Sequence, residues 1–338
     1  MKHLSVIVIC LCIFLVMPLS AQNAAGGDYF FRLTHPDLLT SASSSAGGAF
    51  FSAVPGSIAI NPALTAMEQR VMMNLGYTAL FNSAEEIDMG GAGQVSVLFP
   101  SRWGVFTGVV DGVFCDVDKL QLGNIINLRG GFSKDITDNL YVGMSLNGGC
   151  RWGDDTQWSL GVDMGFVYVL GNVSFLKDLR IGSAVTNLGK PYTQGLTSIG
   201  ILKAGIAGTL FSVANDKFAG AFSADLSFPQ FTNVVFDTGL QFKVADIITI
   251  KTAWQFNLKD TLNKEYNLMP AVGLTAKFKI NAEKNEFLAN KGWQQSEVTT
   301  SAAWQKLYGS VNAVSASAEI NLGLQDTVAP EIILWGEK

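Results

Sequence analysis

Residues 158–170 have the sequence WSLGVDMGFVYVL, in which a large apolar residue occupies almost every second position. Side chains of a β-strand point alternately to its two faces, so this spacing predicts a strand with one apolar face and one small or polar face. The apolar face carries Trp158, Leu160, Val162, Met164, Phe166, Tyr168 and Leu170, and the other carries Ser159, Gly161, Asp163 and Gly165. The length of the apolar face favours contact with lipid.

The same two-faced pattern recurs along most of the chain. The clearest further strands are predicted at 217–228, 233–244, 248–259 and 267–280, and weaker ones at 70–81, 92–99, 102–114, 123–134, 139–150, 178–188 and 198–213. A tilted strand of about 9–14 residues is long enough to cross a bilayer. At about 18 residues per strand and connection, residues 70–325 hold about 14 strands. The predicted fold class is therefore an all-β transmembrane antiparallel β-barrel.

The composition agrees with a lipid-facing exterior. The chain contains 35 glycines and 15% charged residues, against about 25% charged residues in an ordinary soluble domain. Beyond the N-terminus there is no apolar run of about 18 residues, the length that marks a transmembrane helix. The formal net charge is −5 and no basic cluster exists, which argues against nucleic acid as a partner.

The two ends of the chain differ from the rest. Residues 1–21 have the features of a signal peptide, with Lys2, an apolar stretch from Leu4 to Leu19, and small residues before a cleavage point. A membrane-anchor helix is the alternative, but Pro18 and the short length favour cleavage. At the other end, residues 326–338 are predicted to be a C-terminal tail. The export signal and the strands together predict the cell outer membrane as the location.

Connections between the predicted strands alternate in length. Tight turns at 99–103, 134–139 and 244–247 alternate with longer polar loops at 82–89, 115–122 and 259–266. Short periplasmic turns and longer outer loops are typical of outer-membrane barrels. The polar stretch 281–297 breaks the pattern, because the count places it on the short-turn side. Either the count is wrong by one strand or this loop is an exception.

Residues 22–69 do not alternate. They include the small-residue stretch Ser41–Gly48, followed by Phe50 and Phe51. Such a composition is typical of a flexible linker, but the interleaved apolar residues favour a compact segment that packs against another part of the protein.

The stretch Gly56–Leu64, which contains Asn61, Pro62 and Ala63, resembles the end of the N-terminal plug in FadL-like outer-membrane transporters. Ser45–Phe50 is similar to the same plug. Within that family the chain looks closest to a spirochaetal branch and to the PorV-type barrels of secretion systems. The resemblance implies a 14-strand barrel whose lumen is closed by an N-terminal plug (hatch), and passage of hydrophobic molecules through the wall or the plug. The tail after Leu324 departs from the transporters of the family.

The residues for enzymatic chemistry are missing. Only His3 and His35 occur, and His3 leaves with the signal peptide, so we predict no catalytic residue and no enzyme activity; His35 is expected to be a solvated residue. No metal site or cofactor is predicted. Asp111, Asp116 and Asp118 are interpreted as a solvated acidic loop. Cys115 and Cys150 are expected to be two isolated buried thiols, with a disulfide as the alternative.

These observations predict an outer-membrane channel for passive uptake of hydrophobic small molecules such as long-chain fatty acids. Phe50 and Phe51 are candidates to line the ligand site. The first alternative is a barrel of the same shape that transports nothing and docks surface or secretion partner proteins; inward Lys251, Lys259, Lys277 and Lys279 would favour it. A water-filled porin is opposed by the plug, and a soluble β-sandwich by the outward aromatic residues.

Overall fold

The computed structural model describes residues 30–40, 44–48, 50, 53–82, 89–115, 123–153, 156–190, 200–213, 217–229, 231, 233–245, 247–262, 270–281, 295–307 and 311–323. The predicted signal peptide (1–21) and C-terminal tail (326–338) lie outside these residues. Among the described residues, no helix combines the length and the apolar character needed to span a bilayer.

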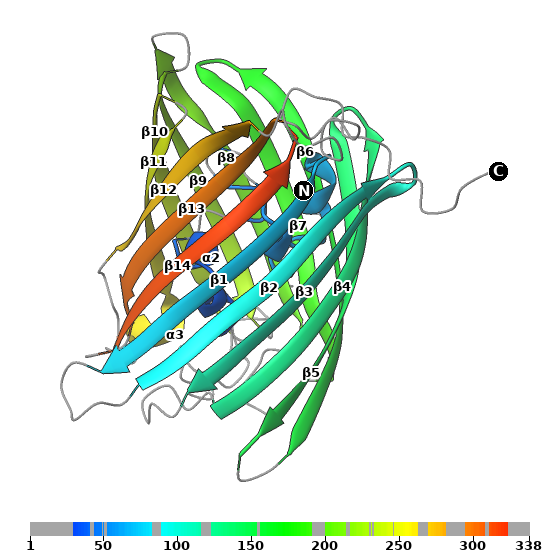
Figure 1. Ribbon diagram of the computed structural model, residues 1–338, viewed down its shortest axis with the longest axis vertical. Coiled ribbons are helices and arrows are strands. Elements are labelled where there is room, and N and C mark those ends of the chain that lie inside the picture. The colour runs from blue at the N-terminus through cyan, green and yellow to red at the C-terminus, as the bar shows by residue number, and fades with distance from the viewer. Residues whose placement is uncertain are drawn as a thin grey trace, which may run out of the picture.

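Within the described residues, fourteen strands form one closed antiparallel barrel, in which each strand pairs with its neighbours in sequence and β1 pairs with β14 (Figure 1). This confirms the predicted fold class and strand number. The strands are β1 (Val71–Asn82), β2 (Met89–Ser101), β3 (Gly104–Cys115), β4 (Gly123–Thr137), β5 (Leu140–Trp152), β6 (Gln157–Val173), β7 (Leu176–Lys190), β8 (Ile201–Val213), β9 (Phe218–Pro229), β10 (Val235–Val244), β11 (Ile248–Asn257), β12 (Ala271–Asn281), β13 (Gln295–Lys306) and β14 (Val311–Leu322).

The alternation of the sequence becomes an alternation of exposure. Trp158 and Leu160 on β6 are each 55% exposed, whereas Asp163 on the other face of the strand is fully buried. The outer wall carries large apolar side chains all the way round, and the buried inner wall carries most of the polar ones. This is the reverse of a soluble protein, where the apolar face is buried.

The two ends of the barrel differ in their connections. At the end where β1 stops, which we call the long-loop end, the connections include 83–88, 116–122, 191–200 and 258–270. At the opposite short-turn end they include 102–103, 138–139, 174–175 and 245–247. Because the strand count is fourteen, the long connection 282–294 lies at the short-turn end, so it is an exception and not a miscount.

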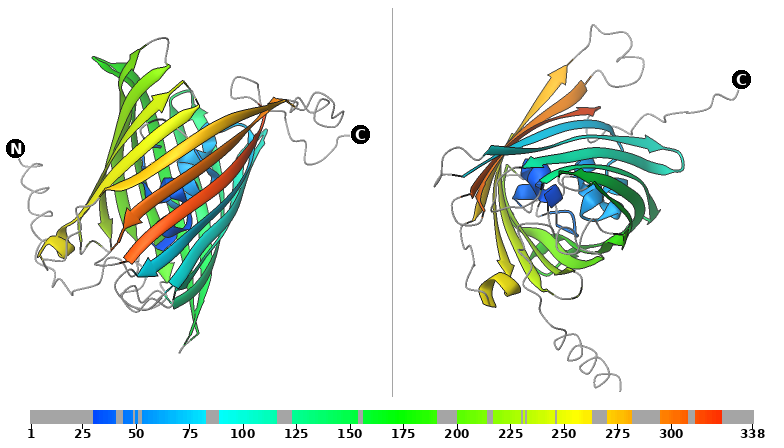
Figure 2. Two further views of the ribbon diagram at one scale, coloured as in Figure 1. Left: turned by 60° about the vertical axis from the view of Figure 1, so that its left-hand side comes forward. Right: turned by 90° about the horizontal axis from the view of Figure 1, so that it is seen from below.

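In the described part of the chain, four short helices lie inside the barrel: η1 (Phe30–Thr34), α2 (Pro36–Leu39), η2 (Pro55–Ala59) and η3 (Pro62–Met67). Figure 2 shows them, in blue, enclosed by the ring of strands when the barrel is seen from below. Three of the four begin at a proline, whose fixed φ suits the first helical position and whose missing N–H leaves no donor unpaired there. We call the described residues from 30 to 67 the lumenal segment.

Two local predictions were wrong. β11 ends at Asn257 and helix α3 (Leu258–Leu262) follows it, so the strand does not continue to Lys259, whose side chain is outside the described part. Cys150 is a free thiol on the exposed surface and is not buried. Cys150 lies on the outer face of β5, where the neighbouring side chains are apolar. A thiol behaves at such a position as a small apolar group. The side chain of Cys115 is outside the described part.

Candidate functional site: the lumen and its N-terminal segment

Asn61 anchors the lumenal segment to the wall. Its extended backbone (φ −154°, ψ 111°) precedes Pro62, and its Oδ1 accepts a hydrogen bond from the Ala63 N–H at 3.0 Å, which caps η3. Its Nδ2 donates to the Ser45 carbonyl at 2.7 Å and to the Phe166 carbonyl of β6 at 3.0 Å. Nδ2 also lies 3.4 Å from the Ser183 carbonyl of β7. One fully buried side chain therefore joins two parts of the segment and two strands.

Glycines of the inner wall bring the segment close to the strands. A Cβ added at Gly143 of β5 would lie 2.5 Å from the Pro62 carbonyl carbon and 2.6 Å from the Ala63 nitrogen. The neighbour of Gly182 is the Ser45 carbonyl, and the neighbour of Gly165 is the Asn61 side chain. At Gly143 and Gly182 the backbones of wall and segment therefore meet directly, and at Gly165 the wall makes room for the Asn61 amide, which glycine permits because it has no Cβ.

Buried ion pairs hold the segment on the other side of the barrel. Lys251 Nζ of β11 donates to Asp37 Oδ1 at 2.6 Å, and Arg32 Nη1 donates to Asp237 Oδ1 of β10 at 3.0 Å. Burial opposes the charge of Asp37, but Lys251 holds the pKa of this carboxyl below its ordinary value. Ser45 donates to Asp225 of β9 from both its N–H and its hydroxyl.

The predicted inward lysines behave differently from one another. Lys251 points into the lumen, whereas Lys277 is half-buried, 3.7 Å from Glu297, and Lys279 is exposed near the end of β12. Of the two candidate ligand residues, Phe50 is half-buried and its ring lies 5.6 Å from Lys243 Nζ. The backbone N–H of Phe50 donates to Gln241 Oε1 at 2.8 Å. Phe51 is outside the described residues.

The expectation that His35 is solvated is wrong, because its side chain is 1% exposed. His35 Nδ1 accepts a hydrogen bond from the Asp37 N–H at 3.1 Å and so caps α2, and its Nε2 lies 3.0 Å from Asn74 Nδ2 of β1. Burial lowers the pKa of His35 to about 4, an effect opposed by Asp37 and by Asn74 and supported by Lys251. The buried imidazole of His35 is therefore uncharged at neutral pH.

We expect docking of the segment to weaken as the pH falls from about 6.5 to about 4. In this range a displaced His35 with the ordinary pKa of 6.5 takes up a proton that the buried His35, with a pKa of about 4, does not. Protonation of Asp37 weakens docking only at lower pH, because the pKa of this carboxyl is lowered in the docked segment. His35→Asn keeps a helix-capping side chain but does not titrate. Limited proteolysis of the segment should rise between about pH 7.5 and pH 5 in the native protein and stay flat in the variant; equal rises would contradict the assignment.

One layer of the lumen is apolar. At the long-loop end, side chains of the inner wall form a single buried cluster with apolar residues of the lumenal segment. The wall contributes Leu80, Ala92, Val113, Ile125, Ala303, Val311 and Ala313, and the segment contributes Leu33, Leu38, Leu39, Ala59 and Ile60. We call this cluster the apolar layer. It lies opposite the short-turn end, where Met72, Leu98 and Val105 form a smaller apolar cluster.

The next inward-facing positions on β2, β3 and β4 are polar. Asp111 is paired in register with Gln94 on β2 and with Asn127 on β4, whose Nδ2 donates to Asp111 Oδ2 at 3.3 Å. The expected solvated loop was therefore wrong for Asp111, which is 3% exposed inside the barrel; Asp116 and Asp118 are outside the described residues. The alternation of Val105, Thr107, Val109, Asp111 and Val113 is the signal in the sequence that places Asp111 on the inner face.

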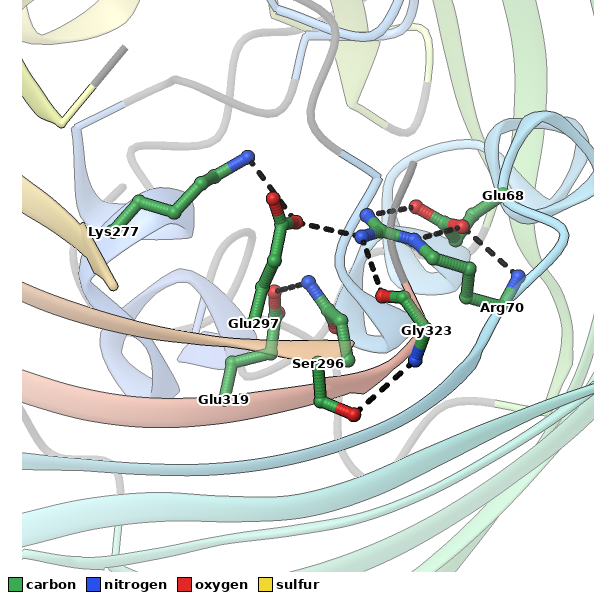
Figure 3. Close-up of polar contacts among 8 residues, drawn as sticks. Glu68, Arg70, Lys277, Ser296, Glu297, Glu319 and Gly323 are labelled. Carbon is green, nitrogen blue, oxygen red and sulfur yellow. Dashed lines mark hydrogen bonds and ion pairs between the residues drawn. The ribbon is translucent and has the colours of Figure 1, made fainter. Parts of the chain in front are cut away.

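A further ion cluster ties the short-turn end together (Figure 3). Arg70, just before β1, donates to both carboxylate oxygens of Glu68 at 2.9 Å and to Glu297 Oε2 of β13 at 2.6 Å. Its Nη1 also lies 3.5 Å from the Gly323 carbonyl after β14. Burial acts against the charge, but Glu68 and Glu297 raise the pKa of Arg70 above its ordinary value. The cluster bridges the seam at which β1 and β14 close the barrel.

In the described part of the chain no group of three or more His, Cys, Asp or Glu side chains could hold a metal ion. No family model and no curated protein matches the chain.

The chain is similar to a number of solved structures, among them the following three. A FadL homologue from Pseudomonas aeruginosa is 11% identical over 85% of this chain and 97% of its own, with a TM-score of 0.49. The toluene transporter TodX from Pseudomonas putida is 11% identical over 78% and 92%, with a TM-score of 0.44. The protein Omp33 from Acinetobacter baumannii is 9% identical over 76% and 99%, with a TM-score of 0.43. At these identities and TM-scores the likeness says nothing of a ligand.

Proposed function

We propose that the chain is an outer-membrane barrel that takes up hydrophobic small molecules, with residues 22–69 as a plug and residues 70–325 as the barrel. The observation that carries this proposal is the apolar layer inside the lumen. A water-filled channel needs a polar inner wall. In this layer the apolar wall residues pack against apolar residues of the lumenal segment. A hydrophobic solute that takes the place of the segment side chains would gain free energy by leaving water.

The outer wall supports the location. Exposed apolar side chains cover it on all the strands, for example Leu75 (58%), Leu128 (61%) and Leu146 (62%). An apolar surface of this extent would aggregate in water and is stable in lipid. With the short turns on the periplasmic side, as is usual, the long-loop end and the apolar layer would face outward, where a solute arrives.

Among the described strand pairs, β11 and β12 have the shortest run of register partners, and this part of the wall suits a lateral exit. β11 pairs with β12 only from Ile248 to Ala253, because β12 begins at Ala271. In the described residues, Trp254–Asn257 therefore has no partner in β12, although it pairs with β10. Fewer backbone hydrogen bonds must break here than elsewhere for the strands to part. The gap lies at the long-loop end, next to the apolar layer on β13.

The second candidate function is the non-transporting barrel that docks surface or secretion partner proteins. The observation in its favour is the set of buried ion pairs that hold the segment in the lumen, Lys251–Asp37 and Arg32–Asp237. If the segment never moves, nothing passes. The two candidates therefore differ in one property, the mobility of the segment.

A reversible cross-link tests this difference. The hydroxyls of Thr65 in the segment and Ser133 on β4 lie 2.7 Å apart, close enough for a disulfide after Thr65→Cys and Ser133→Cys. In proteoliposomes, in a background without the native cysteines, oxidation of this pair should reduce uptake of a hydrophobic tracer at least about tenfold, and reduction should restore it.

The matched control joins two wall strands and leaves the segment free. Thr78 of β1 and Ser315 of β14 also have hydroxyls 2.7 Å apart, and their cysteine pair should leave uptake unchanged in both redox states. Uptake that is absent in the native protein, or indifferent to the Thr65–Ser133 cross-link, would favour the docking scaffold.

A further inference from the structure

Two neighbouring side chains just below the apolar layer have unused hydrogen-bonding atoms. Gln94 on β2 and Asp111 on β3 are register partners, and the next inward-facing pair, Ala92 and Val113, belongs to the apolar layer. Within the described part of the chain, Gln94 Nε2 and Asp111 Oδ1 are buried without a hydrogen-bond partner. Gln94 is 4% exposed and Asp111 is 3% exposed. We call this pair the polar notch.

Unpaired buried polar atoms are costly, by about 1–3 kcal/mol each, so such a pair is expected to meet a partner when the site is filled. The other atoms of both residues are already engaged. Gln94 Oε1 accepts from the Thr34 hydroxyl at 3.1 Å, and Asp111 Oδ2 accepts from Asn127 Nδ2 at 3.3 Å. What remains is one N–H donor and one carboxylate acceptor on adjacent strands.

A hydroxyl group matches this combination. Its hydrogen can be donated to Asp111 Oδ1, and its oxygen can accept from Gln94 Nε2. A carboxylate cannot donate, and its charge would be placed against that of Asp111. The nearby guanidinium of Arg129 does not reverse this balance, because its Nε lies 3.2 Å from Asp163 Oδ2. Together, Asp111, Asp163 and Arg129 carry two negative charges and one positive charge.

We propose that the polar notch binds the hydroxyl of a neutral hydrophobic alcohol or phenol whose apolar body lies in the apolar layer, and that Asp111 rejects carboxylates. The proposal rests on the proposed function and narrows its substrate class, away from the long-chain fatty acids expected from the sequence. Successive inward-facing pairs are about 7 Å apart along a strand, so a short alkyl chain reaches from one level to the next.

The test compares three probes of equal chain length, 1-octanol, octanoate and octane, at about pH 8 with the full chain in lipid nanodiscs. Affinity is measured by competition with a lipophilic fluorescent probe, and empty nanodiscs correct for partition into lipid. We expect 1-octanol to bind at least about tenfold more tightly than octanoate and about tenfold more tightly than octane, the ratio for one well-made hydrogen bond to a charged group.

Two variants separate the contributions. Asp111→Asn should bring the ratio of the affinities for 1-octanol and octanoate close to one, because the side chain loses its negative charge and keeps its shape. Gln94→Leu should reduce the preference for 1-octanol over octane. Asp135→Asn is the charge-matched control, since Asp135 is exposed on β4 towards the short-turn end, and it should change neither ratio.

The outcomes are distinguishable. Binding of none of the three probes would overturn the proposed function, and this inference with it. Octanoate binding as tightly as 1-octanol would overturn the inference and leave hydrophobic uptake standing. Equal affinities for 1-octanol and octane, unchanged by Gln94→Leu, would show that only water occupies the polar notch. This result would also overturn the inference.

Discussion

Replacement of Gly143 by valine is expected to expel the lumenal segment from the wall while the barrel stays closed. The new Cβ would lie 2.5 Å from the Pro62 carbonyl carbon, and both groups belong to backbone that cannot rotate away. Overpacking of this kind destabilises by about 1–3 kcal/mol. The shift displaces Asn61 as well, because Pro62 follows it directly, and Asn61 bonds to both Ser45 and Phe166.

The measurement is limited proteolysis of the segment in reconstituted protein, together with tracer uptake. Each 1.4 kcal/mol raises the population of the displaced segment about tenfold, so cleavage should accelerate about tenfold or more. Gly130→Val is the matched control. Gly130 lies on the outer face of β4, where an added Cβ would meet nothing within 4 Å. Equal cleavage rates in the two variants would show that close packing at Gly143 does not hold the segment to the wall.

The barrel could be predicted from the sequence because its signal is local and repeated. A strand in lipid alternates with period two whatever its partners are, so Trp158 to Leu170 predicts its own faces. The segment lengths predict about fourteen strands. The turn from β11 into α3 at Leu258 was missed, because the alternation runs through Leu258 without a break.

The contents of the lumen could be predicted only in part. The Asn61–Pro62–Ala63 corner is visible locally, since asparagine caps a helix and proline begins one. The partners of the segment are distant in sequence: Asp37 meets Lys251, and Arg32 meets Asp237. No local pattern specifies such pairs. The burial of His35 and Asp111 depends on the same long-range assembly, and both had been expected in solvent.

Polar contacts hold the lumenal segment around most of the barrel wall. On one side they reach β6, β9, β10 and β11, through Asn61, Ser45, Arg32 and Asp37. On the other side His35 lies 3.0 Å from Asn74 of β1, Thr34 donates to Gln94 of β2, and the hydroxyls of Thr65 and Ser133 of β4 lie 2.7 Å apart. Displacement of the segment towards any side therefore breaks buried polar contacts, which is why a single cross-link between Thr65 and Ser133 tests its mobility.

Replacement of Arg70 by methionine is expected to have the largest effect on the barrel itself. Arg70 joins Glu68 at the end of the segment to Glu297 of β13, and these side chains are at most 13% exposed. Without the guanidinium, Glu297 keeps an ion pair with Lys277, 3.7 Å away in the described part of the chain. Removing one partner of a buried ion pair destabilises by about 3–5 kcal/mol, because the remaining charge stays buried.

The urea concentration that abolishes the compact, heat-modifiable form in lipid vesicles should therefore fall clearly for Arg70→Met. Arg102→Met is the control, since Arg102 is exposed and lies 4.7 Å above the Trp103 ring. The triple variant Glu68→Gln, Arg70→Met and Glu297→Gln removes the uncompensated charges and should recover part of the loss. If Arg70→Met unfolds at the urea concentration of Arg102→Met, the ion cluster does not hold the seam, and closure depends on the backbone pairing of β1 with β14 alone.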